Sequence, residues 1–266
     1  IIFDLCVNYF HKSKKTISHD EVTSKHISNC IKMTQIADFV FCSSKMIANS
    51  AKKFNKNSFY IYDSIDFEHF NRKKNIKNFL NDKLRFIWAG VSRKSNELIP
   101  YATILKKKRI PLILICENKP PEFDYPFLFW RKNPTYFKKW RYDTLPNDLL
   151  MGDLMIAPRQ LNSIYNRSHS HFKINLFLSQ GIPVVASPLP SYFEVLKSDV
   201  NGKFFNNLKE FESIVTFLQQ NPDVISKWSR AAIKHSNKFS TRNVVKKYID
   251  CFNILYENGR KVIRKI

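Results

Sequence analysis

The stretch His171–Phe205 reads HFKINLFLSQGIPVVASPLPSYFEVLKSDVNGKFF, and it holds a helix, a turn and a buried strand in succession. Apolar residues dominate Phe172–Ser179 at helical spacing, and Gly181 follows them where a helix end commonly needs a residue in the left-handed conformation. The run Pro183–Ser187 is short and solidly apolar, which is typical of a parallel strand covered on both faces. This order predicts one helix–strand unit of a larger α/β sheet.

Similar units surround this stretch from Leu84 onward. We expect strands at Leu84–Ala89, Ile110–Cys116, Phe127–Trp130, Leu154–Ala157, Pro183–Ser187 and Gly202–Phe205. We expect the crossover helices at Asn96–Lys107, Pro134–Leu150, Phe172–Ser179 and Tyr192–Lys197. Alternation of this kind predicts an α/β fold, a Rossmann-like doubly wound parallel sheet with helices on both faces.

The beginning of the sequence has fewer strand candidates, namely Ile1–Leu5, Phe39–Ser43 and Phe59–Tyr62. We therefore interpret residues 1–70 as the C-terminal part of an incomplete first Rossmann-like domain, and we expect further sequence upstream. Residues 71–83 are polar and predict a linker, and residues 84–239 predict a complete second domain. Residues 240–266 predict an amphipathic helix that crosses back to the first domain.

The chain is strongly basic, with 44 lysine and arginine residues against 22 aspartate and glutamate residues and a formal net charge of +22. Such a surplus favours polyanionic partners, and we expect peripheral contact with an anionic membrane. Signatures of RRM, KH, helix-turn-helix and zinc-finger domains are absent from the sequence, so we expect no specific nucleic-acid partner. The five cysteines are scattered, which predicts no bound metal and a reducing, cytoplasmic location.

The sequence also excludes several enzyme classes. It contains no GxGxxG, Walker A, HExxH or GxSxG motif, which argues against dinucleotide oxidoreductases, P-loop NTPases, zincins and α/β-hydrolases. Only five residues are glycine, so each is expected where the backbone requires it. Gly90 ends the first strand of the second domain, in FIWAGVSRK.

Five pieces of the sequence resemble GT-B glycosyltransferases, in the same order and over essentially the whole chain. The stretch His171–Phe205 is similar to their donor site, and GDLMIAP to the strand before the donor helix. LRFIWAGVSRKSNEL resembles the first strand and phosphate-side loop of the donor domain. ADFVFCSSKMI and FYIYDSIDFEHF resemble the end of the acceptor-side domain and the start of the linker.

The resemblance implies a hexosyltransferase-like enzyme of glycan or surface polysaccharide biosynthesis. It would move a sugar from a nucleotide-diphosphate sugar to a glycan or lipid-linked acceptor, in the cytoplasm or at the inner face of the membrane. It implies no cofactor and no metal, because cationic side chains can stabilise the departing nucleotide diphosphate.

The resemblance also implies a donor site at the carboxyl ends of the strands, near helix N-termini. We expect the donor and its phosphates to be bound by Gly90, Arg93, Lys94, Arg167, Ser168, Lys173, Asn175, Ser191, Tyr192 and Glu194.

The sequence departs from the family at one motif. Many retaining members carry a Glu-x7-Glu pair, one near the donor sugar and the other near the ribose, and those positions hold Ser168 and Leu176 here. The stereochemistry, the donor sugar and the catalytic base are therefore not predicted. Two alternatives stay open. In the first alternative to a glycosyltransferase, the chain is a non-catalytic basic Rossmann-like module that binds an anionic membrane or nucleic acid. In the second, it is a degenerate transferase that serves as a scaffold.

Overall fold

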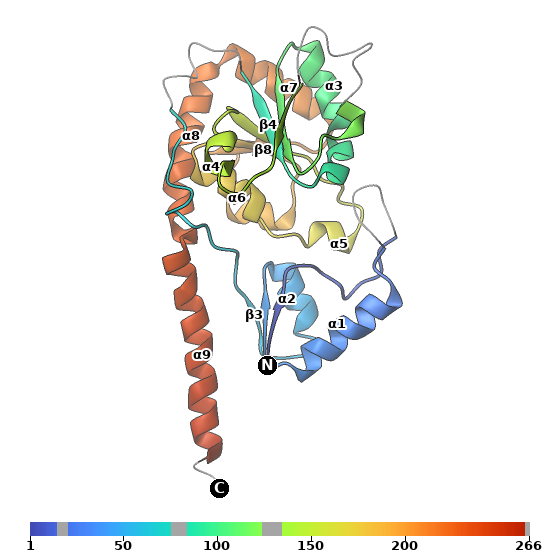
Figure 1. Cartoon of the computed structure of the whole chain (residues 1–266), viewed down its shortest axis with the longest axis vertical. Helices are drawn as coiled ribbons and strands as arrows, with labels where there is room; N and C mark the ends of the chain where they lie inside the picture. The colour runs from blue at the N-terminus through green and yellow to red at the C-terminus, as the bar shows by residue number, and fades with distance from the viewer. Residues whose placement is uncertain (15–20, 76–83, 124–134, 264–266) are drawn as a thin grey trace.

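The structure, a computed structural model, describes residues 1–14, 21–75, 84–123 and 135–263. These residues form two parallel β-sheets, and Figure 1 shows the larger sheet above the smaller one. The long C-terminal helix α9 (Thr241–Ile263) starts beside the larger sheet and runs alongside the smaller one (Figure 1).

The larger sheet has the strand order β6-β5-β4-β7-β8-β9, and every neighbouring pair is parallel. Its strands are β4 (Phe86–Ala89), β5 (Leu112–Cys116), β6 (Thr135–Lys139), β7 (Leu154–Ala157), β8 (Val184–Ala186) and β9 (Gly202–Phe204). From β4 the chain moves outward to β5 and β6, then returns to β7 and continues in the other direction. This arrangement confirms the predicted Rossmann-like doubly wound sheet.

Helices cover both faces of this sheet. They are α3 (Ile99–Lys107), α4 (Leu145–Leu149), α6 (Phe172–Ser179), α7 (Leu208–Gln220) and α8 (Pro222–Ser236). The short helix α5 (Ile164–Arg167) lies between the two sheets (Figure 1), and 3-10 helices occur at Ser92–Leu98, Pro121–Phe123, Pro190–Glu194 and Asn237–Phe239. Strand side chains alternate between the faces. Phe86 and Trp88 join one buried apolar cluster, while Ile87 between them joins the other.

Helix α6 has the bounds that the sequence predicts, and Gly181 explains where it ends. Gly181 has φ of +77°, a conformation that glycine adopts without steric cost. Its carbonyl accepts a hydrogen bond of 2.6 Å from the Ser229 hydroxyl, and a Cβ at this position would lie 3.0 Å from Ile233 Cδ1. The chain can therefore turn directly from α6 into β8 while α8 packs closely against the turn.

Two predicted helices of the larger sheet need correction. The helix predicted at Pro134–Leu150 is wrong, because Thr135–Lys139 forms edge strand β6 and only Leu145–Leu149 is helical. The helix predicted at Tyr192–Lys197 is a short 3-10 helix at Pro190–Glu194. The strand predicted at Phe127–Trp130 lies outside the described residues. Helix α7, which the Asn207 side chain caps, was not predicted.

The smaller sheet has strand order β1-β2-β3, with β1 (Ile2–Leu5), β2 (Phe39–Cys42) and β3 (Ser58–Tyr60), all parallel. Helices α1 (Ser24–Ile36) and α2 (Lys45–Ala51) follow its first two strands. One face carries a buried cluster that includes Val40 and Cys42.

Helix α9 supplies the other face of this sheet. Val244 and Cys251 of α9 are buried against Phe39 and Phe41 of β2. Just before α9, the Ile65 amide donates to the Phe239 carbonyl at 2.8 Å, so the chain is hydrogen-bonded at the crossing point. Of the helices in the described residues, none combines the length and hydropathy of a membrane-spanning segment.

Candidate functional site

The first candidate site is a cavity of about 180 Å³ at the carboxyl ends of β4 and β7. The chain winds away from these two neighbouring strands in opposite directions, and such switch points are where open α/β sheets bind ligands. The lining residues come from both strand ends and from the beginning of α6: Trp88, Lys94, Glu97, Ala157, Pro158, Arg159, His169, Ser170, Phe172, Lys173 and Tyr192. We call this the cation cavity.

Three positive side chains converge on the cation cavity. Lys94 lies on the 3-10 helix after β4, Arg159 follows β7, and Lys173 lies in the first turn of α6. Burial and the positive charges of Arg159 and Lys94 together lower the pKa of Lys173 to about 7, while the charge of Glu97 acts in the opposite direction. Burial and Arg159 likewise lower the pKa of Lys94 to about 8.

This balance of charges is unfavourable without an anion. Glu97 is the carboxylate on the cavity wall, against three cations. The buried Nε of Arg159 and the buried Oε1 of Glu97 have no hydrogen-bond partner among the described residues. Such buried groups are costly unless they find a partner. A diphosphate would supply negative charge and several acceptor oxygens at this place.

Gly90 allows the cation cavity to be this compact. The ammonium of Lys173 lies 5.1 Å from the centre of the Trp88 ring, a cation–π distance. A Cβ on Gly90 would lie 3.0 Å from Lys173 Nζ and 2.7 Å from Trp88 Cζ2. Any larger residue at position 90 would therefore displace the lysine or the indole.

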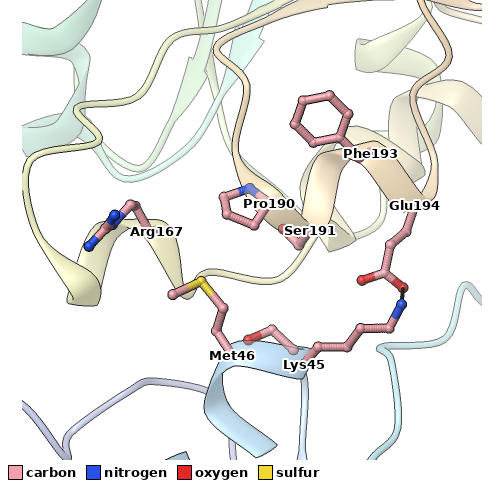
Figure 2. A pocket seen from close by; sticks show the side chains of 8 residues that line it. Lys45, Met46, Arg167, Pro190, Ser191, Phe193 and Glu194 are labelled. Carbon is pink, nitrogen blue, oxygen red and sulfur yellow. Dashed lines mark ion pairs between the residues drawn. The ribbon is translucent and has the colours of Figure 1, made fainter. Parts of the chain in front are cut away.

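A second cavity of about 350 Å³ lies between the two sheets (Figure 2). Its lining comes from α2 below and from α5 and the loop after β8 above: Ser44, Lys45, Met46, Arg167, Pro190, Ser191, Phe193 and Glu194. We call this the cleft cavity. Figure 2 shows Glu194 pointing towards Lys45, with Glu194 Oε2 3.3 Å from Lys45 Nζ.

Hydrogen bonds join the two sheets around the cleft cavity. Tyr60 at the end of β3 donates to Glu194 Oε2 at 3.0 Å, and its hydroxyl lies 3.3 Å from His171 Nε2. Burial lowers the pKa of His171 to about 4, so this imidazole is neutral at neutral pH. Burial and the neighbouring Glu194 raise the pKa of Tyr60, which therefore keeps its proton.

The ten predicted site residues fall into separate places. Lys94, Lys173 and Tyr192 line the cation cavity, and Gly90 lies next to the Lys173 ammonium. Arg167, Ser191 and Glu194 line the cleft cavity instead. Arg93 is exposed and lines neither cavity.

The structure does not bring the two remaining residues, Ser168 and Asn175, into either cavity. The Ser168 hydroxyl donates to the Ile164 carbonyl at 2.7 Å and accepts from Asn8 Nδ2 at 2.9 Å, so it ties the two sheets together. Asn175 is 1% exposed in the middle of α6.

Sequence reasoning missed Arg159 and Glu97. Arg159 follows the apolar strand LMIAP and its Pro158. The carboxyl end of a parallel strand is where a ligand-binding side chain is expected, so this position offered a usable signal. Glu97 offered none, because an acidic residue on a surface helix is common.

No cluster of three His, Cys, Asp or Glu side chains with metal-binding geometry occurs within residues 1–14, 21–75, 84–123 and 135–263.

Comparisons with known proteins place the fold. No protein-family model matches the sequence, and no curated protein matches it. Solved structures match closely in shape. Sucrose-phosphate synthase from Thermosynechococcus elongatus superposes with a TM-score of 0.72 at 10% identity, over 97% of this chain and 68% of that one.

Two further glycosyltransferase structures are similar in shape. Anabaena HepE in complex with UDP-glucose gives a TM-score of 0.68 at 16% identity, over 96% of this chain and 72% of that one. TarM of S. aureus gives 0.69 at 13% identity, over 95% of this chain and 50% of that one. These comparisons show that the chain has the GT-B fold, and that it spans between half and three quarters of the length of these proteins.

Proposed function

We propose that this chain binds a nucleotide-diphosphate sugar in the cation cavity and belongs to an enzyme that transfers the sugar to an acceptor. One observation carries the proposal: Lys94, Arg159 and Lys173 converge at the switch point of a GT-B donor sheet, where burial and mutual repulsion lower the pKa values of both lysines.

The chemistry of sugar transfer gives these cations their role. When the bond between the anomeric carbon and the diphosphate breaks, negative charge grows on the leaving phosphate oxygen. Preorganised cations in a partly dry site stabilise that charge more strongly than water does. Lys173 approaches from the helix N-terminus, Lys94 and Arg159 from two strand ends, so the diphosphate would be held from three sides.

The cleft cavity is the proposed place for the transferred sugar and the acceptor. It adjoins the donor loop at Ser191 and is closed from below by α2. Glu194 would accept hydrogen bonds from sugar hydroxyls, because Tyr60 and Lys45 hold its carboxylate at the cavity wall. A site between the two sheets also lets the acceptor approach while water is excluded.

The proposal also extends to the donor sugar and to the wider role of the enzyme. HepE has been solved with UDP-glucose and with UDP, so a UDP-sugar is the first donor to test. We place the activity in the assembly of a glycan or polysaccharide from cytoplasmic donors. The large positive charge would favour an anionic membrane surface that carries a lipid-linked acceptor.

Thermal unfolding with added ligands tests the donor site. UDP, GDP, ADP and inorganic pyrophosphate are compared with uridine, which lacks phosphates. A ligand that binds only the folded state adds about 2.7 kcal/mol of stability at a hundredfold excess over Kd. We expect at least one nucleoside diphosphate to raise the melting temperature, and uridine to raise it far less. If no diphosphate shifts the transition at millimolar concentration, the proposal is wrong.

A variant without the Lys173 charge distinguishes diphosphate binding in the cation cavity from attraction by the net positive charge of the chain. Lys173→Met keeps the length of the side chain and removes its charge, and it should weaken diphosphate binding by about 1.5–3 kcal/mol. Lys234→Met, at an exposed position of α8, is the matched control and should bind as the parent does. Equal loss in both variants would mean that the diphosphate binds through net charge and not in this cavity.

A further inference from the structure

A third cavity of about 570 Å³ adjoins the cation cavity, with Phe172 and Lys173 forming part of both walls. Its lining comes mainly from the carboxyl ends of β4, β5 and β6 and from α6, and is largely apolar: Phe70, Ala89, Gly90, Val91, Glu117, Trp140, Tyr142, Leu145, Leu149, Phe172, Lys173, Leu176 and Phe177. Its volume lies within the range of about 300–1,000 Å³ that is typical of small-molecule sites. We call it the apolar cavity.

Aromatic surfaces are prominent in the apolar cavity. Trp140 and Tyr142 follow β6, and their side chains are 46% and 52% exposed. The Tyr142 ring is stacked on His69 at a centroid distance of 4.0 Å and an angle of 6°. His69 Nε2–H also donates to the Tyr142 carbonyl at 3.0 Å. Tyr142 is therefore held in place as a platform, and flat rings of this kind stack well on a nucleobase.

Glu117 is the carboxylate of the apolar cavity, directly after β5. The Ser92 amide donates to both of its oxygens at 3.0 Å, and the Ser92 hydroxyl donates to Oε1 at 2.6 Å. Burial alone would raise the pKa of Glu117, but these hydrogen bonds outweigh it and hold the pKa below its usual value. The carboxylate is thus charged and fixed in orientation, with acceptor capacity left on Oε2.

We propose that Glu117 binds the ribose hydroxyls of the donor nucleotide, whose base lies in the apolar cavity against Trp140 and Tyr142. The inference rests on the proposed function, because it takes the diphosphate in the cation cavity as its starting point. A diol that meets a carboxylate forms charge-assisted hydrogen bonds, and in Rossmann-like folds an acidic residue downstream of the first βα turn commonly makes this contact.

The composition of the opposite wall strengthens the assignment. Leu176 on α6 faces the same cavity and is apolar, so α6 offers no carboxylate to the ribose there. Glu117 supplies one from the β5 side. Gly90 and Val91 lie on the lining between Glu117 and Lys173, where a ribose would connect a base to a diphosphate. An alkyl chain would fit the apolar walls equally well, but it could not hydrogen-bond to the Glu117 carboxylate on the same lining.

Ligand pairs that differ by one hydroxyl test the inference on the full chain. The nucleoside diphosphate that stabilises the chain best among UDP, GDP and ADP is compared by calorimetry with its 2′-deoxy form and with inorganic pyrophosphate. We expect the parent to bind the ribose form about tenfold more tightly than the deoxy form, a difference of about 1.4 kcal/mol. Equal affinities in the parent would overturn the role of Glu117.

Variants then locate the contact. Glu117→Gln should lose most of the preference for the ribose form and keep its affinity for pyrophosphate. Glu212→Gln, an exposed position of α7, is the matched control and should keep the preference. Trp140→Ala should weaken nucleotide binding roughly tenfold, with no change for pyrophosphate.

Three results would contradict the inference, and they differ in what else they contradict. If Glu117→Gln keeps the ribose preference, Glu117 only caps the 3-10 helix at Ser92, and the proposed function still stands. If Glu117→Gln and Trp140→Ala weaken pyrophosphate as much as nucleotide, their effect is on the fold. If pyrophosphate and all nucleotides fail to bind the parent, both this inference and the proposed function are wrong.

Discussion

The two sheets of this chain obtain their buried faces in different ways. The larger sheet is covered on both faces largely by the helices of its own crossovers, and its side chains alternate between two extensive apolar clusters. The smaller sheet is covered on one face by its own helices and on the other by α9, from the opposite end of the chain. The larger sheet therefore builds a ligand site from its own residues, whereas the smaller sheet depends on distant contacts.

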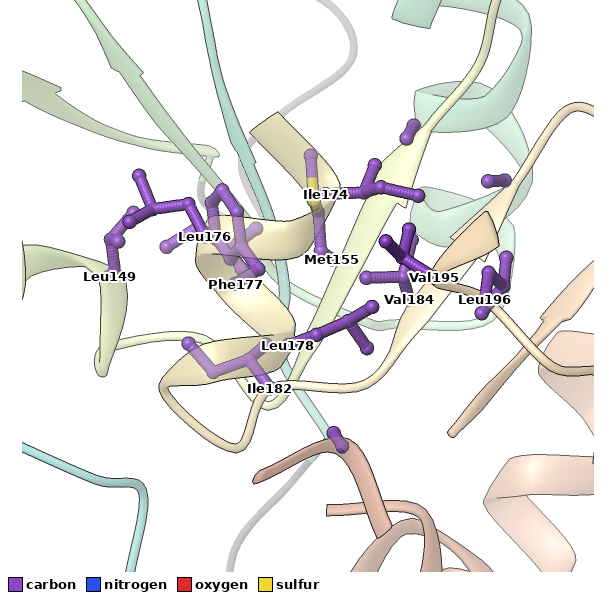
Figure 3. Close-up of a cluster of buried hydrophobic side chains, with 14 of the residues drawn as sticks. Leu149, Met155, Ile174, Leu176, Phe177, Leu178, Ile182, Val184, Val195 and Leu196 are labelled. Carbon is purple, nitrogen blue, oxygen red and sulfur yellow. The ribbon is translucent and has the colours of Figure 1, made fainter. Parts of the chain in front are cut away.

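The largest expected effects come from removing one large buried side chain from the core next to each sheet, and measuring stability and diphosphate binding. Phe177 on α6 is completely buried and packs among Leu149, Leu178 and Ile182 (Figure 3). Phe177→Ala should lower the free energy of unfolding by about 3–5 kcal/mol, the usual cost of such a cavity. It should also weaken diphosphate binding, because α6 carries Lys173. Urea unfolding followed by circular dichroism measures the first effect, and calorimetry the second.

The matched variants sharpen the result. Phe41→Ala removes a buried ring from β2 that contacts Tyr248 of α9 edge-on at 4.9 Å. It should destabilise the smaller sheet and leave diphosphate affinity unchanged. Phe217→Ala, at a 43% exposed position of α7, should have little effect on either quantity. If Phe41→Ala weakened diphosphate binding as much as Phe177→Ala, the two sheets would not be independent in function.

Protonation of the cation cavity gives a smaller, pH-dependent effect. The pKa of Lys173 is about 7 and that of Lys94 about 8, so a bound diphosphate should raise both and take up protons. Affinity should therefore fall as the pH rises from about 7 to 9, by at most about tenfold per pH unit for each lysine. Calorimetry in buffers of different ionisation enthalpy measures the proton uptake.

The free protein should show the opposite trend. Both lysines have folded-state pKa values below their usual value of 10.5, so the unfolded chain binds more protons between about pH 7 and 10.5. Stability of the free protein should rise across that window. Lys173→Met should reduce the proton uptake on diphosphate binding, and Lys234→Met should leave it unchanged. Proton release on binding would contradict the assignment of the diphosphate to these lysines.

Local patterns in the sequence were enough to predict the helix, turn and strand at and directly after α6. The Phe172–Ser179 helix, the Gly181 turn and the strand after it were all predicted, because apolar spacing and a left-handed glycine are short-range signals. Edge strand β6 was missed, because Thr135–Lys139 has no continuous apolar run and its lysines face solvent. An edge strand is stabilised by its pairing with β5, which the sequence does not display.

The candidate site was predicted only in part, for a similar reason. Lys94 and Lys173 follow from their places at a strand end and a helix start. Arg159 follows a predicted strand, which was a usable signal, but its closeness to Lys94 and Lys173 depends on β4 and β7 being neighbours in the sheet, which is a tertiary property. Ser168 was expected at the donor, but its hydroxyl is hydrogen-bonded to Asn8, in the loop after β1, and to the Ile164 carbonyl. Contacts between the two sheets cannot be inferred from either sheet's sequence alone.

The smallest expected effect concerns the bonds that join the two sheets. Tyr60→Phe removes a hydroxyl that donates to Glu194 and lies beside His171. The ring remains, so packing is kept, and the loss should be about 1 kcal/mol in the free energy of unfolding. Tyr136→Phe, on a 48% exposed side chain of β6, is the control and should cost almost nothing.

Because Glu194 faces the cleft cavity and not the cation cavity, Tyr60→Phe should bind nucleoside diphosphate as the parent does. It should bind a UDP-sugar that uses Glu194 less tightly, since Tyr60 no longer holds the carboxylate in place. Equal affinity of parent and variant for both ligands would show that this bond only joins the sheets and that Glu194 does not contact the sugar.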